Sequence, residues 1–373
     1  MAKVVLAMSG GVDSSVAAEL LLKEGHDVIG VFMRHGEQSP VAQCSLETKG
    51  GSDSLPILGR LDHKQGCCSA TDAEDARLVA DRLDIPFYAL NLEEEFGEIM
   101  DYFAEEYFQG RTPNPCIACN NWIKFGKLFD YADSVGAEYV ATGHYARLAN
   151  TPADPTTEPA LLMGIDETKD QSYVLFGIEK KRLHRMLLPV GHFHKSEIRK
   201  MATNVGLRVA EKKDSQEICF VTTGKHVDFL SPRKKEETSG EIVTTEGEVI
   251  GQHDGYERYT IGQRKGLGIA MGEPYFVVKI EPETRRVIIG KKEALATTEL
   301  TACKTNWLVN VPDSPFDCSV KIRYSSKAVA ARATVLPEGR LRVVFENPCY
   351  GVAPGQAVVC YDKQQVLGGG WIE

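Results

Sequence analysis

The stretch VVLAMSGGVDSSVAAELLLKEG, residues 4 to 25, decides the fold of the first half of the chain. Its first residues, VVLAM (4–8), have the composition of a buried strand, and DSSVAAELLLKEG (13–25) predicts a helix that ends at a glycine. The loop between them, AMSGGVDSS (7–15), combines two glycines with three serines. Such a loop at the carboxyl end of a strand suits phosphate, because backbone N–H groups and the dipole of the following helix attract negative charge.

The same alternation of strand and helix continues to about residue 144. DVIGVFM (27–33), IPFYALNL (85–92) and AEYVATGH (137–144) predict strands, and helical patterns at 71–83, 94–108 and 122–136 separate them. This β-α-β-α order predicts an α/β fold, a doubly wound parallel sheet with helices on both faces.

Beyond about residue 215 the pattern becomes one of short alternating runs separated by Gly, Pro or Asn turns, such as SVKIRYSS (319–326). This pattern predicts antiparallel β structure, with a small barrel at the end. A chain of 373 residues also exceeds what one core usually organises. We therefore expect three domains: a nucleotide-binding domain over 1–217, a β-rich linking domain over 218–294 and a C-terminal β-barrel over 295–373.

Composition narrows the class of protein. No apolar run approaches the ~18 residues of a membrane span, so we expect a cytoplasmic protein. Ten cysteines in such a chain argue for reduced thiols, a metal or catalysis rather than a disulfide framework. The balance of 43 Lys+Arg against 52 Asp+Glu does not indicate nucleic-acid binding, but local basic clusters such as KKRLHR (180–185) and KSEIRK (195–200) leave it open.

The glycine loop fits neither a P-loop, G-x-x-x-x-G-K-[ST], nor a dinucleotide fingerprint, G-x-G-x-x-G. S-G-G-x-D-S is instead the pattern of the PP-loop ATP pyrophosphatases, which split ATP between the α and β phosphates and pass AMP to a substrate oxygen. A tight turn without a ligand is the alternative. Asp13 would either cap the helix, which is the favoured role, or hold a magnesium ion that bridges the phosphates.

Further motifs follow in order: TPNPCIACN (112–120), ATGHYAR (141–147), KDQSYVLF (169–176), KKDSQEICF (212–220), YTIGQRKGLGI (259–269) and PGQAVV (354–359). Together with SGGVDSS they resemble the tRNA-specific 2-thiouridylases, over nearly the whole chain. Members of this family replace O2 of the wobble uridine by sulfur in tRNAs for Lys, Glu and Gln. ATP, with Mg²⁺, adenylates the oxygen, and a cysteine persulfide supplies the sulfur.

The resemblance implies two reactive thiols: Cys119 as the nucleophile and Cys219 as the persulfide carrier, which is charged by a cysteine desulfurase or a relay protein. We expect the Cys119 thiolate to lie at a helix N-terminus, which lowers a thiol pKa, and Lys212 and Lys213 to act similarly on Cys219 if the fold brings them near. The two cysteines are far apart in the sequence, so the loop around Cys219 is expected to move between states.

The resemblance also implies binding residues, in a protein expected to be a monomer without membrane association. The ATP site is expected to include Ala7, Met8, Ser9, Gly10, Gly11, Val12, Asp13, Ser14, Met33 and Gly143. The target base is expected at Asn114, Pro115 and Cys116, and the rest of the tRNA at His144, Lys169, Asp170, Gln171, Arg323, Tyr324 and Gln356. No residue is assigned as a metal ligand.

Two departures from the family pattern stand out. Many members carry an Asp at the position of Cys116, where an acid would act as general base for the uridine N3 proton. In this chain the general base must therefore be another group of the protein, the tRNA itself or a Cys116 thiolate. The segment after Met33 is also long and carries Cys44, His63, Cys67 and Cys68. Their irregular spacing favours a flexible loop over a metal site.

Other interpretations of the cysteines and of His144 are weaker. A zinc site at Cys116 and Cys119 would need two more ligands, and no second C-x-x-C exists. A dithiol redox role would need a thioredoxin-like pattern. His144 alone, without the resemblance, would be a strand-end histidine. Four cysteines of the second half are expected to be small core residues: Cys303, Cys318, Cys349 and Cys360.

Three function classes follow: a tRNA 2-thiouridylase, another PP-loop ATP pyrophosphatase of the synthetase or amidotransferase type, or an RNA-binding protein with a vestigial ATP loop. The pair of reactive cysteines discriminates among them, because only the first class needs it.

Overall fold

The computed structural model describes residues 1–34, 70–149, 159–212, 218–221, 226–269 and 271–373. Cys44, His63, Cys67, Cys68 and Lys213 lie outside the described residues. Within the described part, no helix is long and apolar enough to cross a membrane.

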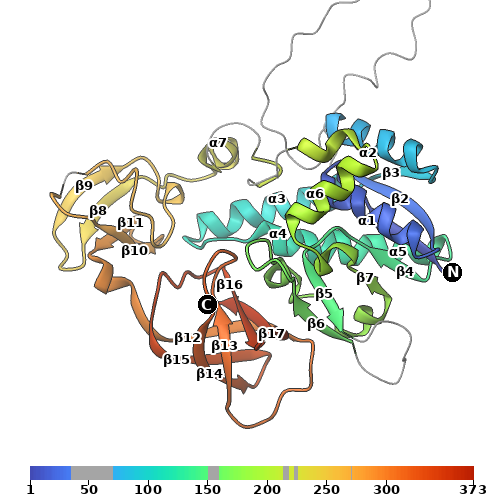
Figure 1. Ribbon diagram of the computed structural model, residues 1–373. Coiled ribbons are helices and arrows are strands. Elements are labelled where there is room, and N and C mark those ends of the chain that lie inside the picture. Colours follow the sequence, from blue (N-terminus) through green and yellow to red (C-terminus); the bar gives the residue numbers. More distant parts are fainter. Residues whose placement is uncertain (35–69, 150–158, 213–217, 222–225, 270) are drawn as a thin grey trace, which may run out of the picture.

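A five-stranded parallel sheet forms the centre of the N-terminal domain (Figure 1). Its order is β3-β2-β1-β4-β7, with bounds Phe87–Asn91, Asp27–Arg34, Lys3–Ala7, Tyr139–Ala141 and Met186–Leu187. Each neighbouring pair is parallel, with Val5 opposite Ile29 on one side and Val140 on the other. The predicted doubly wound sheet is therefore confirmed.

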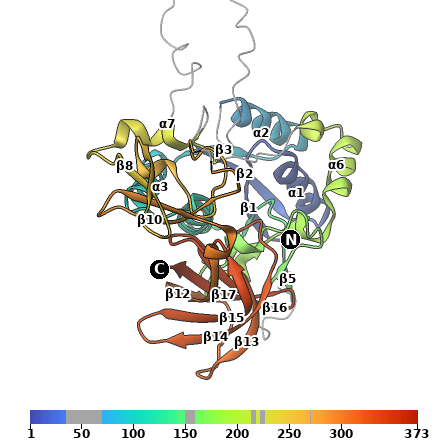
Figure 2. The same ribbon diagram turned by 90° about the vertical axis from the view of Figure 1, so that its left-hand side faces the viewer.

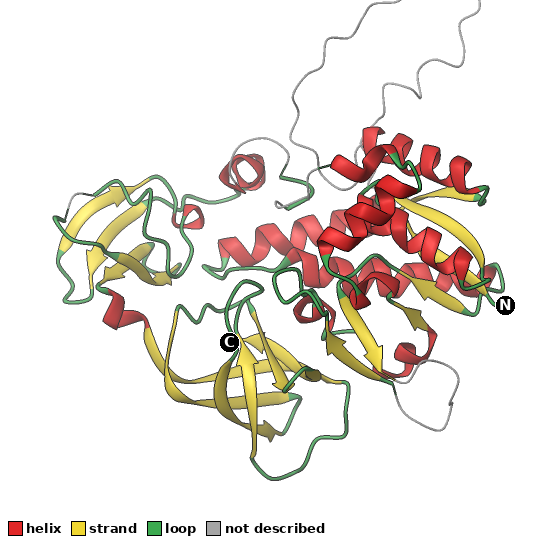
Figure 3. Cartoon of the chain, viewed as in Figure 1, coloured by secondary structure: helices red, strands yellow, loops and turns green. Residues whose placement is uncertain are grey.

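Alternate residues of β1 face the two helical layers. Val4 and Leu6 pack with the helices α1 (Val12–Lys23), α2 (Ala70–Leu83) and α6 (Lys195–Asn204). Val5 and Ala7 pack on the opposite face with α3 (Glu93–Phe108) and with a helical run made of α4 (Pro115–Ala118), the π-helix η2 (Cys119–Lys127) and α5 (Leu128–Ser134). Because successive side chains of a strand point to opposite faces, one apolar strand anchors both layers. Figure 3 shows the helices on either side of the sheet.

The linking domain is a four-stranded sheet at the end of α3, in the order β10-β11-β8-β9. Its strands span Phe276–Glu281, Arg286–Gly290, Gly240–Thr244 and Val249–His253. The contact with α3 includes a hydrogen bond of 2.8 Å from the Tyr256 hydroxyl to the carbonyl of Phe108. The expectation of purely antiparallel pairing was wrong here, because β11 and β8 run parallel. After β9 the chain leaves the sheet, and Tyr256–Arg258 form the 3₁₀ turn η8.

Six strands form the closed C-terminal barrel. They are β12 (Ala296–Trp307), β13 (Phe316–Lys321), β14 (Val329–Leu336), β15 (Arg340–Tyr350), β16 (Ala357–Asp362) and β17 (Gln365–Ile372). β12 pairs with β17, which closes the barrel, although no pattern in the sequence had indicated β12. A hairpin of the N-terminal domain, β5 (Ala146–Ala149) and β6 (Ala160–Met163), extends the same sheet through the pair Gln365 and Leu162.

The barrel lies directly beneath the N-terminal domain and shares its hydrophobic core (Figure 2). Ala357, Val359 and Tyr361 of β16 belong to the cluster that packs on the lower face of the parallel sheet. The buried hydroxyl of Tyr173 donates to the carbonyl of Ala357 at 2.9 Å. Because the two domains share one core, the barrel holds a fixed position relative to the sheet.

The remaining elements are short. They are α7 (His226–Leu230) and the 3₁₀ turns Ser172–Leu175, Lys180–Arg185, Pro189–His192, Arg208–Glu211, Ser231–Arg233 and Lys292–Leu295.

Candidate active site

The loop between β1 and α1 is tightly packed. Glycine is required at one position within it and at one position of the neighbouring backbone after β4. Gly10 has a φ of +69°, and a Cβ there would overlap the carbonyl of Asp72. A Cβ on Gly143, after β4, would lie 2.7 Å from the backbone nitrogen of Ser14. The backbone after β4 therefore approaches the start of α1 as closely as it can, at the carboxyl edge of the sheet where such folds bind ligands.

Asp13 does not cap α1, which corrects the favoured expectation. Gly11 is the N-cap residue and no side chain caps this helix. The Asp13 carboxylate instead accepts hydrogen bonds from Lys195 Nζ, at 2.8 Å to each oxygen, and from the Tyr145 hydroxyl at 2.7 Å. Lys195 is buried at the start of α6, where its backbone N–H donates to Asp166 at 3.0 Å. An acid, an ammonium and a phenol thus meet beside the glycine loop.

A second lysine contacts the loop from the other side. Lys212 Nζ lies 2.6 Å from carboxylate oxygens of both Asp72 and Asp75, and 2.9 Å from the carbonyl of Gly10. The Lys212 ammonium is thus paired with two carboxylates of α2, and its expected effect on Cys219 stays a prediction. Sequence reasoning missed Lys195, Tyr145, Asp72 and Asp75 beside the glycine loop, although Lys195 lies in a basic cluster and Tyr145 in ATGHYAR.

The segment with the two neighbouring cysteines starts a helix earlier than expected. Asn114 is the N-cap, its Oδ1 accepts from the N–H of Ile117 at 3.3 Å, and Pro115 occupies the first turn. Cys116 follows it and is exposed, whereas Cys119 lies one turn further along and is half-buried. The expectation that Cys119 lies at the helix N-terminus was therefore wrong; Cys116 occupies that turn, where the dipole acts most strongly.

The helix changes its winding at Cys119, where α4 passes into the π-helix η2. Ile117 and Ala118 belong to the same core cluster as Ala7, the last residue of β1. π-helical turns often occur at functional sites. Cys119 thus lies where the winding of the helix changes, on a helix that shares a core with the strand preceding the glycine loop.

The barrel clamps the residues just before this helix. Gln356 Nε2 donates to the carbonyls of Thr112 and Pro113, at 3.1 and 3.2 Å. The N–H of Thr112 in turn donates to the carbonyl of Pro354 at 2.7 Å. A Cβ on Gly355, with a φ of +87°, would lie 2.9 Å from the Thr112 carbonyl. The barrel loop therefore fixes the entry to the cysteine helix through backbone contacts.

Cys219 lies on a short described segment that docks on α3. Its neighbours Ile218 and Phe220 join an aromatic cluster, in which the Phe220 ring lies 5.2 Å from that of Phe103. Cys219 is half-buried and packs, like Cys119, against the core beneath the parallel sheet. The structure thus puts both cysteines against one hydrophobic cluster.

His144 is buried after β4, where its Nδ1 is 2.7 Å from the hydroxyl of Thr142 and its ring centroid 6.1 Å from that of Phe125. Burial, and then the nearby charge of Lys124, lower the pKa of His144 well below its ordinary value. The imidazole is therefore neutral at neutral pH.

The positions expected to contact tRNA differ in accessibility. Asp170 is buried and accepts from Lys321 Nζ of the barrel at 3.4 Å, Gln171 accepts from the N–H of Tyr145 at 2.9 Å, and Lys169 is half-buried. Arg323 donates to the carbonyls of Ile261 and Gly351, at 2.8 and 2.7 Å, and joins the linking domain to the barrel.

Tyr324 follows Arg323 in the barrel and is 43% exposed. Burial, then the charges of Asp170 and Cys116, raise the pKa of its phenol. Its ring centroid lies 6.5 Å from that of the buried Tyr173, edge to face. The barrel therefore presents a partly exposed aromatic ring at its contact with the N-terminal domain.

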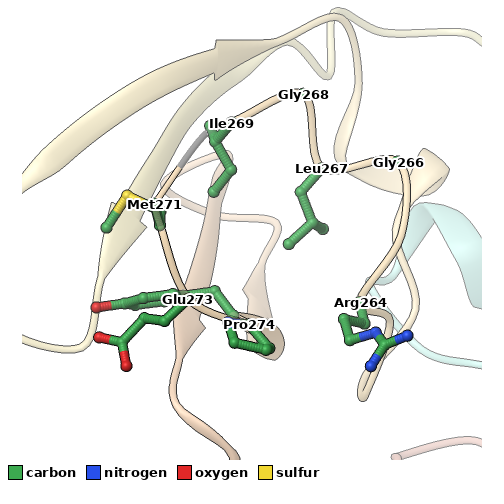
Figure 4. Close-up of a pocket in the computed structure, with 9 residues that line it drawn as sticks. Arg264, Gly266, Leu267, Gly268, Ile269, Met271, Glu273 and Pro274 are labelled. Carbon is green, nitrogen blue, oxygen red and sulfur yellow. The ribbon is translucent and has the colours of Figure 1, made fainter.

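A pocket of about 410 Å³ lies apart from these residues, in the linking domain (Figure 4). It is lined by Arg264, Gly266, Leu267, Gly268, Ile269, Met271, Glu273, Pro274 and Tyr275. None of the residues expected from the sequence to form the site lines it.

The fold and the loop define the class of protein: a PP-loop ATP pyrophosphatase domain, which binds ATP, joined to a linking domain and a β-barrel. Family models match the chain in three parts: a tRNA methyl transferase HUP domain at residues 2–223, a tRNA methyl transferase PRC-barrel domain at 227–291 and an aminomethyltransferase beta-barrel domain at 297–372. Curated relatives of full length are named tRNA-specific 2-thiouridylase MnmA. The chain belongs to the family of tRNA-specific 2-thiouridylases, as the motifs indicated.

Two relatives illustrate the match. The protein of Rhodopirellula baltica is 56% identical over 389 residues, which cover 100% of this chain and 96% of the relative. That of Geotalea uraniireducens is 46% identical over 373 residues, which cover 100% and 95%. Among solved structures, NMN synthetase from Francisella tularensis is 14% identical with a TM-score of 0.33, covering 57% of this chain and 66% of that one, too low a score to support an argument.

Proposed function

We propose that this chain converts the wobble uridine of tRNAs for Lys, Glu and Gln into 2-thiouridine, using ATP to activate O2 and a persulfide on Cys219 to supply sulfur. One observation carries the proposal. The helix that bears Cys119 belongs to the same core cluster as Ala7, the last residue of β1 before the glycine loop. A nucleophile and a phosphate-binding loop that share one core suit a reaction in which adenylation and sulfur transfer follow each other.

The first step is adenylation. Uridine O2 attacks the α-phosphorus of ATP, pyrophosphate leaves, and the C2 oxygen becomes part of AMP, a good leaving group. MgATP is the substrate, and the Asp13 carboxylate offers the oxygen ligands that Mg²⁺ prefers. Lys195 and Tyr145, which contact Asp13, supply a cation and a hydroxyl beside the phosphates.

The second step is sulfur transfer. The terminal sulfur of the Cys219 persulfide attacks C2, and AMP leaves with the former O2. The Cys119 thiolate then attacks the Cys219 sulfur, the S–S bond of the persulfide breaks, and 2-thiouridine is released while a Cys119–Cys219 disulfide forms. If Cys119 instead releases hydrosulfide before the attack on C2, the same disulfide results. Both routes require the segment around Cys219 to approach Cys119 within about 7 Å between Cα atoms.

The tRNA would lie across the cysteine helix and the barrel, with the target uridine flipped out toward Asn114, Pro115 and Cys116. Tyr324 and Lys169 offer an exposed ring and a cation for the adjoining nucleotides. A cysteine desulfurase or a relay protein would charge Cys219. We further propose that the enzyme acts as a monomer in the cytoplasm.

The experiment that tests the proposal uses Cys219→Ser, with a cysteine desulfurase and cysteine as the sulfur source. We expect the variant to lose tRNA thiolation while its affinities for ATP and tRNA stay within about twofold of the wild type, because Cys219 carries sulfur and binds neither ligand. Cys303→Ser, a half-buried cysteine of β12, is the matched control and should retain activity. Full thiolation by Cys219→Ser would contradict the proposal.

The alternative of another PP-loop ATP pyrophosphatase, which needs no thiol pair, is not favoured by the full-length relatives.

A further inference from the structure

A third thiol accompanies the two that the proposed reaction uses. Cys116 is exposed, whereas Cys119 and Cys219 are half-buried. The backbone N–H of Cys119 donates to the carbonyl of Cys116, so the two cysteines are one helical turn apart. Cys116 is therefore more accessible to solvent than Cys119, the proposed nucleophile.

Helix geometry places these two cysteines within reach of each other. Residues three apart on a helix have Cβ atoms about 5–6 Å apart. A disulfide needs Cβ atoms about 3.5–4.5 Å apart and Cα atoms within about 7 Å. A small local adjustment is therefore enough to join Cys116 and Cys119, and the π-helical winding that starts at Cys119 is a place for it.

We propose that Cys116 is a resolving thiol that clears the Cys119–Cys219 disulfide after each turnover. This inference rests on the proposed function, which produces that disulfide. The Cys116 thiolate attacks Sγ of Cys119, a Cys116–Cys119 bond forms, and the Cys119–Cys219 bond breaks. Its electron pair leaves on Cys219 as a thiolate, which takes up the proton that Cys116 released. The exchange changes no net oxidation state and returns Cys219 ready to accept sulfur.

The exchange moves the disulfide to Cys116, which an external reductant can reach. A dithiol reductant of protein size must reach the sulfur that it attacks, and Cys116 is the exposed member of the three. Attack on Cys116 opens the Cys116–Cys119 bond, the second thiol of the reductant closes its own disulfide, and both cysteines return to thiols. Gln356 of the barrel holds the backbone just before this helix through two hydrogen bonds. The Cys116–Cys119 disulfide would therefore form on a segment whose position is fixed.

A different role for Cys116, as the general base for uridine N3, predicts a different response to substitution. Cys116→Asp would supply a base but no sulfur, and Cys116→Ser would supply neither. If Cys116 acts only as a base, Cys116→Asp keeps the later turnovers as fast, relative to the first, as in the wild type. If Cys116 resolves the disulfide, both variants slow after the first turnover.

The first measurement maps disulfides in the wild type. Enzyme charged with one persulfide sulfur reacts with MgATP and unmodified tRNA without reductant, is alkylated in acid and is digested. We expect 2-thiouridine together with a Cys116–Cys119 disulfide and alkylated Cys219. A Cys119–Cys219 disulfide with fully alkylated Cys116 would overturn the inference and leave the proposed function intact. Absence of 2-thiouridine, with all three thiols alkylated, would overturn both.

The second measurement follows repeated turnover with a thioredoxin-type protein dithiol as the reductant, and each variant's own first turnover is the reference. We expect the later turnovers of Cys116→Ser and Cys116→Asp to slow at least fivefold and the Cys119–Cys219 disulfide to accumulate in both. Cys303→Ser should show the wild-type ratio. An unchanged ratio in Cys116→Asp would overturn the inference.

Discussion

The side chain of Gln356 donates a hydrogen bond to the carbonyl of Thr112 at 3.1 Å, and this contact joins the last domain of the chain to the segment that leads into Cys116 and Cys119. The residues are far apart in sequence, yet the barrel shares a core with the N-terminal domain, so the contact is held on both sides. The barrel therefore takes part in shaping the segment proposed to carry the nucleophile.

Gln356→Ala should slow thiolation about tenfold, because a small misplacement of a nucleophile raises the barrier. The lost hydrogen bonds cost only ~1 kcal/mol each in the free energy of unfolding. Single-turnover thiolation and urea unfolding measure the two effects. Gln364→Ala is the matched control, since Gln364 accepts from Arg147 at 2.6 Å across the same interface but away from the cysteine segment. Equal rate losses in both variants would contradict a role for the hydrogen bonds from Gln356 to Thr112 and Pro113.

Lys195→Met should lower kcat/KM for ATP at least tenfold, because it removes the cation that contacts Asp13 beside the glycine loop. Lys200→Met removes an exposed lysine from the same helix, α6, and should stay within about twofold of the wild type. The measurement is tRNA-dependent formation of AMP from ATP over a range of ATP concentrations. Similar values for the two variants would remove Lys195 from the ATP site.

Asp170→Ala should act mainly on stability, although the family resemblance places this residue at the tRNA. The Asp170 carboxylate is buried and accepts from Lys321, from the N–H of Gly164 and from Ser172. Removing it leaves a buried ammonium without its carboxylate, at a cost of roughly 3–5 kcal/mol. Chemical unfolding tests this loss, and Lys169→Ala is the comparison, expected to weaken tRNA binding with little change in stability. An Asp170→Ala variant of wild-type stability would contradict the structural role.

The stability of the protein should fall in mild acid through His144. Burial lowers its pKa below the ordinary value of 6.5, so the unfolded chain binds a proton that the folded chain does not. The stabilising effect is complete above pH 6.5 and is lost as the pH falls below it, by up to about 1.4 kcal/mol per pH unit for one proton. Urea unfolding at pH 7.5 and 5.5 should show a smaller loss in His144→Gln than in the wild type. His184→Gln, at an exposed position, should lose as much as the wild type.

Local patterns in the sequence predicted four strands of the parallel sheet, because those runs are apolar and alternate with helical patterns. They missed the fifth strand, β7, whose two residues Met186–Leu187 are too short to show a pattern. They missed β12, whose sequence ATTELTACKTNW is rich in Thr and only partly buried, so its alternation is weak. They also placed the start of the cysteine helix about two turns too late, although Pro115 after Asn114 is an ordinary start signal.

Residue patterns indicated the glycine loop of the candidate site, but they could not indicate contacts made by the tertiary fold. The roles of Cys119 and Cys219 come from the family resemblance and stay predictions. The contacts of Asp13 with Lys195 and of Lys212 with Asp72 join residues more than a hundred positions apart. No local period records such pairs, because they depend on where the sheet brings the ends of its strands.

The most direct test of the proposed function is to incubate the protein with ATP, Mg²⁺, a sulfur source and unmodified tRNA for Lys, Glu or Gln, and then to analyse the nucleosides by mass. The account predicts one exchange of sulfur for oxygen, at the wobble uridine, that depends on ATP. Cleavage of ATP with no sulfur in the tRNA, or sulfur at another nucleoside, would contradict it.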